Sequence, residues 1–168
     1  MNAFQKKPTF LNYVIQITFI FLFNIVVLQL FRMIDTSSVI WAVGSGSLAA
    51  SSCIVFAKPS AVSAHPLRLL AAYCLAILSG TLLHFIGTVV CAHAAQCAIM
   101  TVFAGLAVCI ALISMFLLRL EHPPALGMAL VLALELQDYD ASLIVLLAVA
   151  ILVIFRFLFG SFLRDLYS

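Results

Sequence analysis

The feature that most constrains this chain is a run of fifty residues, Leu69 to Leu118, without Asp, Glu, Lys or Arg. A membrane-spanning helix takes about 20 apolar residues, so this run has room for two. Hydrophobic residues make up 66% of the sequence and charged residues 8%, with a mean hydropathy of +1.28, whereas soluble domains carry about 25% charged residues. The sequence therefore predicts a polytopic membrane protein embedded in a lipid bilayer.

The pattern of apolar runs predicts an all-α bundle, a single transmembrane domain formed by residues 1–168. Charges, prolines and a break at Cys91–Gln96 divide it into six expected helices, at about residues 8–31, 36–57, 67–90, 97–118, 125–136 and 141–163. A fifth helix of that length rises about 18 Å, against a hydrocarbon core of about 30 Å. It either re-enters the membrane, leaving five spans, or crosses as a short helix buried among its neighbours. We favour six segments.

Polar and ionisable residues are concentrated between Arg119 and Asp140. An ionisable side chain at the bilayer centre costs about 3 kcal/mol or more unless it is paired or wetted, so this stretch is expected at an interface or in a protein-lined cavity. Pro123 removes a backbone donor and disfavours helix at His122, so the preceding helix should stop near residue 119 or 120. Pro124 then opens the short fifth helix as its first residue.

The second helix contains Gly44, Ser45, Gly46 and Ser47 in succession, and two interpretations of this stretch remain open. Small residues allow helices to approach one another closely in a membrane. Alternatively, the two glycines loosen the helix, and the N–H groups and hydroxyls at such a break would suit a small anion.

Two isolated polar residues lie in otherwise apolar segments. His84 is either a hydrogen-bonded packing residue or a contact for a proton or substrate. Arg156 either extends its long side chain to the membrane interface, which we favour, or pairs with an acid such as Glu135.

The sequence Glu121-His122-Pro123-Pro124-Ala125, which closes an apolar helix and precedes a short Ala/Leu segment, resembles the signature of the HPP family of small integral membrane proteins. Val43–Tyr73 is similar to the family's second recurring block, with matches at Phe56, Ala57, Pro59, Pro66 and Arg68. The resemblance covers residues 41–168. It implies a transport function, because plant members are associated with nitrite transport into chloroplasts. The chain departs from the family pattern at Leu70, Ala71, Ala72 and Leu126.

Several classes of function are disfavoured by the sequence. A net charge of +2, dispersed along the chain, does not favour a nucleic-acid partner. Motifs for a catalytic nucleophile, zinc, phosphate or a dinucleotide are missing, and the five cysteines have no metal-like spacing. We therefore expect neither enzyme activity nor a cofactor. An intramembrane enzyme acting on a lipid or isoprenoid at Glu121 and His122 is a weaker alternative.

The distribution of basic residues predicts the orientation. With six spans, one side holds six basic residues and the other holds Arg32 with Asp138 and Asp140; the six are Lys6, Lys7, Lys58, Arg68, Arg119 and Arg164. Because basic residues accumulate on the cytoplasmic side, both termini are expected in the cytoplasm. We expect a bacterial inner (plasma) membrane protein, and a homo-oligomer is compatible with the sequence.

The leading hypothesis is a transporter or channel for a small inorganic anion, nitrite by resemblance to the family. Two helix interruptions would meet inside the bundle and supply the site, formed by Gly44, Ser45, Gly46, Ser47, His84, Arg119, Glu121, His122, Pro123 and Pro124. Arg119 would attract the anion or pair with Glu121, and Glu121 and His122 would relay a proton. The alternative is a non-transporting structural subunit of a membrane complex.

Overall fold

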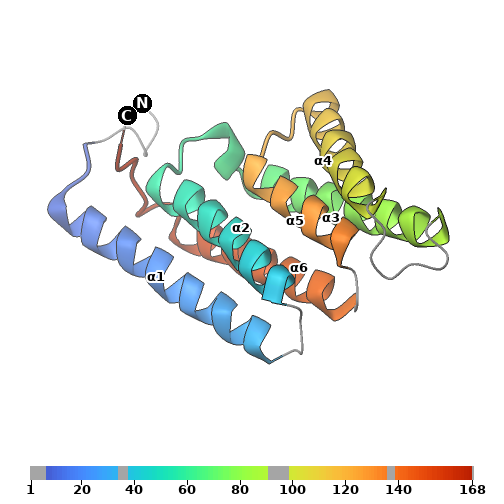
Figure 1. Ribbon diagram of the computed structural model, residues 1–168. Helices are drawn as coiled ribbons and strands as arrows, with labels where there is room; N and C mark the ends of the chain where they lie inside the picture. The colour runs from blue at the N-terminus through green and yellow to red at the C-terminus, as the bar shows by residue number, and fades with distance from the viewer. Residues whose placement is uncertain (1–6, 34–37, 91–98, 136–138, 168) are drawn as a thin grey trace.

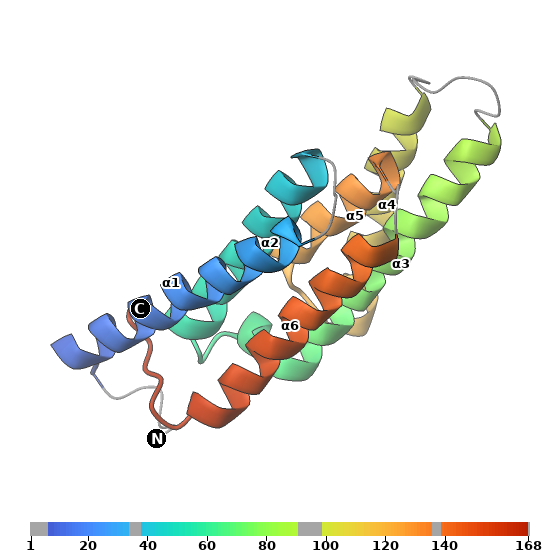
Figure 2. The same cartoon turned by 90° about the horizontal axis from the view of Figure 1, so that it is seen from below.

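The computed structural model describes residues 7–33, 38–90, 99–135 and 139–167. All regular structure in this part of the chain is helical, and the helices form an elongated bundle (Figures 1 and 2). Five helices are long and apolar enough to cross a membrane: α1 (Phe10–Arg32), α2 (Ser38–Ala57), α3 (Pro66–Val90), α4 (Ile99–Leu118) and α6 (Tyr139–Phe159). The predicted all-α membrane bundle is confirmed. The expected break at Cys91–Gln96 lies outside the described residues.

The short fifth helix, α5 (Leu126–Leu134), lies at the centre of the bundle after a single 3₁₀ turn, η3 (Pro123–Ala125). It rises about 14 Å, less than half of the hydrocarbon core. It packs against α2, α3 and α4, and most of its side chains are buried, among them Met128, Ala129, Val131, Leu132 and Ala133. A helix too short to span is stable there because protein, and not lipid, surrounds it.

The direction of α5 follows from its neighbours. Towards α2, Pro124 contacts Ser47, while Met128 lies near Gly44, so these two helices are antiparallel. Towards α3, Ala129 lies near Gly80 and Ala133 bonds His84, so these two run in the same direction. In chain order, α5 follows α4 and precedes α6, and it runs from the end of the bundle at which α4 stops towards the end at which α6 begins (Figure 1). This agrees with the predicted arrangement of six segments.

The predicted helix break at Gly44–Ser47 is wrong, because α2 is continuous from Ser38 to Ala57. Gly44 faces inward, where an added Cβ would lie 2.9 Å from the Phe31 ring and 3.6 Å from the Met128 sulfur. The small residue allows α1 and α5 to approach α2 closely, so the packing interpretation of this stretch holds. Gly46 faces the opposite way, with no atom within 4 Å of an added Cβ.

Two helix ends follow from local chemistry. Helix α4 stops at Leu118 as predicted, and Arg119 adopts a left-handed conformation (φ 56°) while Leu120 N–H bonds the Met115 carbonyl at 2.8 Å. This is a Schellman-type stop. Helix α6 ends at Phe159, four residues before the predicted end, because the chain turns at Gly160, where a Cβ would lie 2.7 Å from the Arg156 carbonyl.

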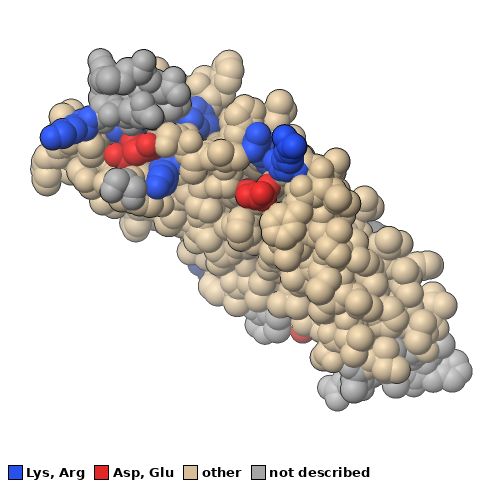
Figure 3. Space-filling view, turned by 90° about the horizontal axis from the view of Figure 1, so that it is seen from above, with Lys and Arg blue, Asp and Glu red and all other residues tan. Residues whose placement is uncertain are grey.

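After this turn, the C-terminal tail packs against the beginning of α1 and the end of α2. Tyr13 donates to the Leu166 carbonyl at 2.8 Å, Leu166 N–H bonds the Ala57 carbonyl at 2.9 Å, and Gln16 bonds main-chain atoms of Arg164. The α2–α3 and α4–α5 connections lie at this same end, which we call the basic end. Most of the charged side chains visible in Figure 3 gather over it, and most of the surface beyond them is uncharged.

We expect Gly80→Ala to lower the free energy of unfolding by about 1–3 kcal/mol, because the added Cβ of the alanine would meet the main chain of α5 in the packed interface between α3 and α5. That Cβ would lie 2.8 Å from the Ala129 carbonyl oxygen. The matched control is Gly105→Ala, whose Cβ has no atom within 4 Å and which should be neutral or stabilising by up to about 1 kcal/mol. Unfolding of the purified protein in detergent, followed by circular dichroism, measures both. Equal effects would contradict the close contact between α3 and α5.

Candidate functional site

Four polar side chains meet in the interior of the bundle, and we call Ser47, Ser51, Tyr73 and His122 the polar cluster. The Tyr73 hydroxyl lies 2.8 Å from Ser47 Oγ and 2.8 Å from Ser51 Oγ. Ser51 Oγ lies 2.8 Å from His122 Nε2. Tyr73, Ser51 and His122 are fully buried, and Ser47 is nearly so. Buried polar groups in a membrane protein are expensive and mark functional sites by default.

Backbone groups of two connecting segments complete the polar cluster. His122 Nδ1 donates to the Ser63 carbonyl at 3.1 Å, and Ser47 Oγ donates to the Pro124 carbonyl at 2.5 Å. Ser63 belongs to η2 (Val62–Ala64), the 3₁₀ turn between α2 and α3, whereas Pro124 lies in η3. The cluster therefore joins α2, α3, η2 and the start of α5.

The local sequence explains how the cluster forms. Ser47 and Ser51 are four residues apart on α2, so their hydroxyls lie on one face of the helix. His122 precedes a proline, which favours extended backbone, and its φ of −143° and ψ of 79° carry the imidazole away from the axis of α4. The ring then packs beside the Tyr73 ring, with centroids 5.7 Å apart.

The environment of His122 keeps its imidazole neutral. Burial lowers its pKa from 6.5 to about 4, and the hydrogen bond to the Ser63 carbonyl opposes this shift only in part. A carbonyl can only accept, so Nδ1 carries the proton and Nε2 of the neutral ring accepts. At neutral pH the polar cluster therefore contains hydroxyls, carbonyls and an uncharged ring, with no formal charge among its four side chains.

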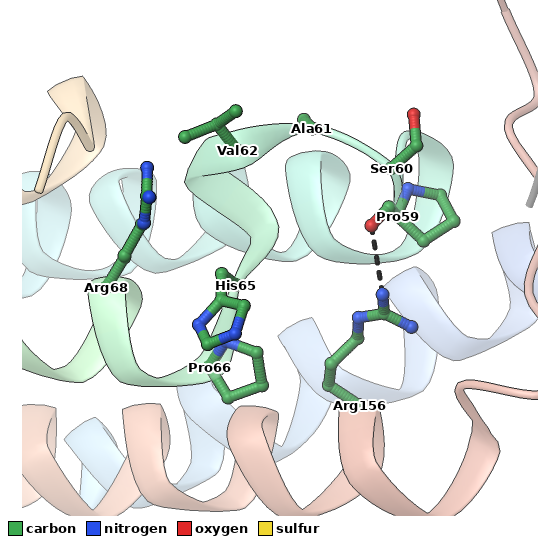
Figure 4. A pocket seen from close by; sticks show the side chains of 8 residues that line it. All are labelled: Pro59, Ser60, Ala61, Val62, His65, Pro66, Arg68 and Arg156. Carbon is green, nitrogen blue, oxygen red and sulfur yellow. Dashed lines mark hydrogen bonds between the residues drawn. The ribbon is translucent and has the colours of Figure 1, made fainter. Parts of the chain in front are cut away.

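A pocket of about 300 Å³ opens at the basic end, and we call it the basic pocket. It is lined by Pro59, Ser60, Ala61, Val62, His65, Pro66, Arg68 and Arg156. Figure 4 shows Arg68 and Arg156 on opposite sides, with His65 between them. Arg156 Nη2 donates to the Pro59 carbonyl at 2.9 Å, so its side chain reaches the end of the bundle, as the favoured interpretation of this residue predicts.

Two arginines line the basic pocket, and the carboxylate of Asp165 lies beside it. Asp165 of the tail bonds the main-chain N–H and the hydroxyl of Ser60, and its charge acts on Arg156. Arg68 and Arg156 together outweigh this one carboxylate. Guanidinium groups present planar, paired donors that match the two oxygens of a small planar anion.

The polar cluster and the basic pocket share one structural element, the turn η2. Val62 and the following His65 line the pocket, while the Ser63 carbonyl accepts the hydrogen bond from His122. A movement of this three-residue turn would therefore affect both places at once. The turn η2 therefore connects the charged end of the molecule to the polar cluster.

The structure separates the predicted site residues into groups. Ser47, His122 and Pro124 come together in or beside the polar cluster, so the two predicted stretches do meet. Gly44 packs against Phe31 and Met128, and Ser45 and Gly46 lie on the outer side of α2, where the Ser45 hydroxyl bonds its own helix at Ala42. The remaining four predicted residues do not join the cluster through any contact described here; they are His84, Arg119, Glu121 and Pro123.

Three of these four have other surroundings. Arg119 and Glu121 are exposed at the basic end, outside the lining of the basic pocket. His84 donates from Nδ1 to the Ala133 carbonyl at 3.1 Å, near the opposite end of α5. The last carbonyls of a helix lack partners within it, so this bond satisfies the end of α5 and favours the packing interpretation of His84.

The first amide groups of α5 are already engaged. Pro123 and Pro124 have no N–H, Ala125 N–H bonds the His122 carbonyl at 3.0 Å, and Leu126 N–H bonds the carbonyls of Pro123 and Pro124. The helix start therefore offers none of these amides to an anion in the arrangement described.

Comparison with known proteins places the chain in a family. Residues 5–167 match the family described as HPP, transmembrane region. The chain belongs to the HPP family. Neither curated proteins nor solved structures show a significant match to it. The chain is therefore an integral membrane protein of the HPP family, in agreement with the resemblance drawn from the residues.

Sequence reasoning missed two members of the HPP chain's polar cluster, Ser51 and Tyr73. Ser51 follows Ser47 by four residues, and this spacing, which places both hydroxyls on one face of a helix, is a signal that could have found it. Tyr73 carries a phenol that needs a hydrogen-bond partner wherever it is buried, which is a usable signal in an apolar helix. The basic pocket was also missed, because its lining comes from the α2–α3 connection and from α6, nearly a hundred residues apart.

We expect the stability of this HPP chain to fall as the pH is lowered from 7 to 4. The pKa of His122 is about 4 in the folded protein and 6.5 in the unfolded chain. As the pH falls, His122 of the unfolded chain therefore takes up a proton at a higher pH than His122 of the folded protein. The stabilisation is complete above pH 6.5 and is lost towards pH 4, by about 3 kcal/mol in total. Unfolding in detergent across this range measures it. His122→Gln should remove this part of the pH dependence, whereas His65→Gln, at an exposed histidine, should retain it.

Proposed function

We propose that this HPP-family chain transports a small inorganic anion across the membrane, with nitrite as the anion that the family resemblance implies. The observation that carries the proposal is the connection of a cationic pocket at one end to a buried polar cluster through a single short turn. Interior polar groups of membrane proteins mark solute and ion pathways. The anion would bind first at Arg68 and Arg156, which differs from the site expected at Gly44–Ser47.

The size and chemistry of the basic pocket fit this role. Its volume of about 300 Å³ accommodates a three- or four-atom oxyanion with several waters. Two guanidinium groups and the exposed His65 supply donors around the space, and the single carboxylate of Asp165 limits the excess of positive charge. A site with moderate net charge binds an anion and still releases it, as conduction requires.

The route inward requires a second arrangement of the bundle. In the arrangement described, η2 separates the basic pocket from the polar cluster, and α2 is closely packed against α1 and α5. We propose that withdrawal of η2 from His122 opens the cluster to the pocket. Alternating access of this kind, in which parts of a bundle rock about a central site, is common among transporters.

The orientation of the chain completes the proposal. The basic end contains Lys7, Lys58, Arg68, Arg119 and Arg164, whereas Arg32 lies at the other end of α1. By the positive-inside tendency, we propose that the basic end faces the cytoplasm of a bacterial cell, with both termini there. The basic pocket would then be the cytoplasmic mouth of the pathway.

Nitrite uptake into proteoliposomes that contain the purified chain tests this function. Arg68→Gln should raise the half-saturating nitrite concentration about tenfold, because one charge-assisted hydrogen bond is lost. Arg119→Gln is the matched control, since Arg119 is an exposed arginine at the same end but outside the pocket. Uptake no faster than in protein-free liposomes would contradict the proposal. Equal effects of the two variants would contradict the role of the pocket.

The second candidate function is a non-transporting structural subunit. It is favoured by the close packing of α2 at Gly44 and by the complete engagement of the α5 start. The same flux measurement separates the two candidates, since a structural subunit would conduct no nitrite at any concentration.

A further inference from the structure

The contacts of the polar cluster form one chain of five links that begins and ends on a carbonyl. In order, it runs from the Ser63 carbonyl through His122, Ser51, Tyr73 and Ser47 to the Pro124 carbonyl. The successive distances are 3.1, 2.8, 2.8, 2.8 and 2.5 Å. Each link needs one proton, because two lone pairs that face each other at such distances repel.

The neutral cluster has one proton too few for these links. A neutral imidazole carries one N–H, and each hydroxyl carries one proton, so the four side chains supply four protons for five links. Carbonyls supply none. Wherever the protons are placed, one link is left without a proton. A fifth proton on His122 allows every link to be filled: Nδ1 donates to the Ser63 carbonyl, and from Nε2 onward each donor gives to the next atom towards Pro124.

One further contact does not change this result. Ser51 Oγ also lies 3.0 Å from the Ser47 carbonyl, which in an α-helix already accepts the main-chain N–H four residues on. Including this contact adds an acceptor and no proton. The cluster is therefore rich in acceptors, which disfavours a bare anion in its interior and favours a species that brings a proton.

We infer that the polar cluster is a binding site for one proton that is transported together with the anion, an inference that rests on the proposed transport function. A proton enters from the aqueous phase at the basic pocket, binds at His122 Nε2, and leaves on the other side with the anion. A monovalent anion and one proton carry no net charge together. The coupled step is therefore electroneutral, and no covalent bond to a non-hydrogen atom is made or broken.

The surroundings of His122 explain why proton and anion would bind together. Burial disfavours the imidazolium, and the hydrogen bond to the Ser63 carbonyl offsets this only in part. A monovalent anion in the basic pocket would offset the excess positive charge of Arg68 and Arg156 over Asp165 and so favour the proton. Binding of either then strengthens binding of the other by the same factor.

The other groups packed around His122 bring no competing charge into its immediate contacts. Helix α2 presents Ser51, α3 presents Tyr73, η2 presents the Ser63 carbonyl, and α5 from Leu126 to Leu134 contains no titratable side chain. The charged chain neighbours Arg119 and Glu121 are exposed, so water screens them.

Tyr73→Phe tests the proton site directly, because it removes the shortage of protons and retains the aromatic ring. Without the phenol, three links remain, and His122, Ser51 and Ser47 supply three protons. Tyr13→Phe is the control, since the Tyr13 hydroxyl also donates to a carbonyl, that of Leu166 in the C-terminal tail, and is not part of the polar cluster. If Tyr73→Phe does not fold, Ser47→Ala gives the same three links and three protons, with the buried Ser79→Ala as its control.

The measurement is the initial rate of nitrite uptake into proteoliposomes, with a pH-sensitive dye in the lumen. Rates in protein-free liposomes are subtracted, because nitrous acid crosses lipid unaided. We expect the unmodified protein and Tyr13→Phe to acidify the lumen by one proton per anion, with rates unchanged by an inside-negative potential. Tyr73→Phe should take up nitrite without the proton and slow about threefold or more under a potential of about 100 mV, because an uncompensated charge then moves.

The outcomes separate this inference from the proposed function. Nitrite uptake by the unmodified protein that slows under the potential and moves no proton would overturn the proton site and leave the transport function intact. Electroneutral uptake retained in both Tyr73→Phe and Ser47→Ala would also overturn it. No uptake by the unmodified protein at any pH would contradict the transport function itself, and the coupled proton with it.

Discussion

The constraint on which this structure depends is that a polar group inside a membrane must find its partners within the protein. Pro123 and Pro124 force the chain to leave helical geometry in a region surrounded by apolar segments. Hydrogen-bond partners for this stretch come from Ser47 and Ser51 of α2 and from the Ser63 carbonyl of η2, while the Tyr73 ring of α3 packs beside His122. The central position of α5 follows, because only a helix that starts from a satisfied break can be so short and so buried.

The molecule divides its polar chemistry between two depths. Four of the five arginines lie at the basic end, namely Arg68, Arg119, Arg156 and Arg164, where long side chains reach water and phosphate headgroups at small cost. The polar cluster in the interior consists of hydroxyls, carbonyls and a histidine held neutral by burial. Under the proposed function, an anion would bind at the surface, and the proton that accompanies it would offset the excess of acceptors inside. The turn η2, which contacts both the basic pocket and the polar cluster, would link the two sites.

Prediction from sequence succeeded where the physics is local. Apolar runs gave the number of helices, and the prolines gave the end of α4 at Leu118 and the short helix after it. It failed at Gly44–Ser47, because glycine and serine lower helix propensity in isolation, whereas packing against Phe31 and Met128 keeps α2 helical. It also failed for Ser51 and Tyr73, whose roles depend on which faces of two helices meet.

By itself, the sequence determined the class of the protein, its division into six helical segments and the polar character of the stretch at His122, because hydropathy and proline geometry act over a few neighbouring residues. Only the tertiary structure decided that His122 bonds Ser51 and Ser63, that α5 lies among α2, α3 and α4, and that Arg68 and Arg156 share a pocket. These contacts join residues that are distant in the chain. They depend on the close packing of whole helices, in which the position of each face is set by all of its neighbours.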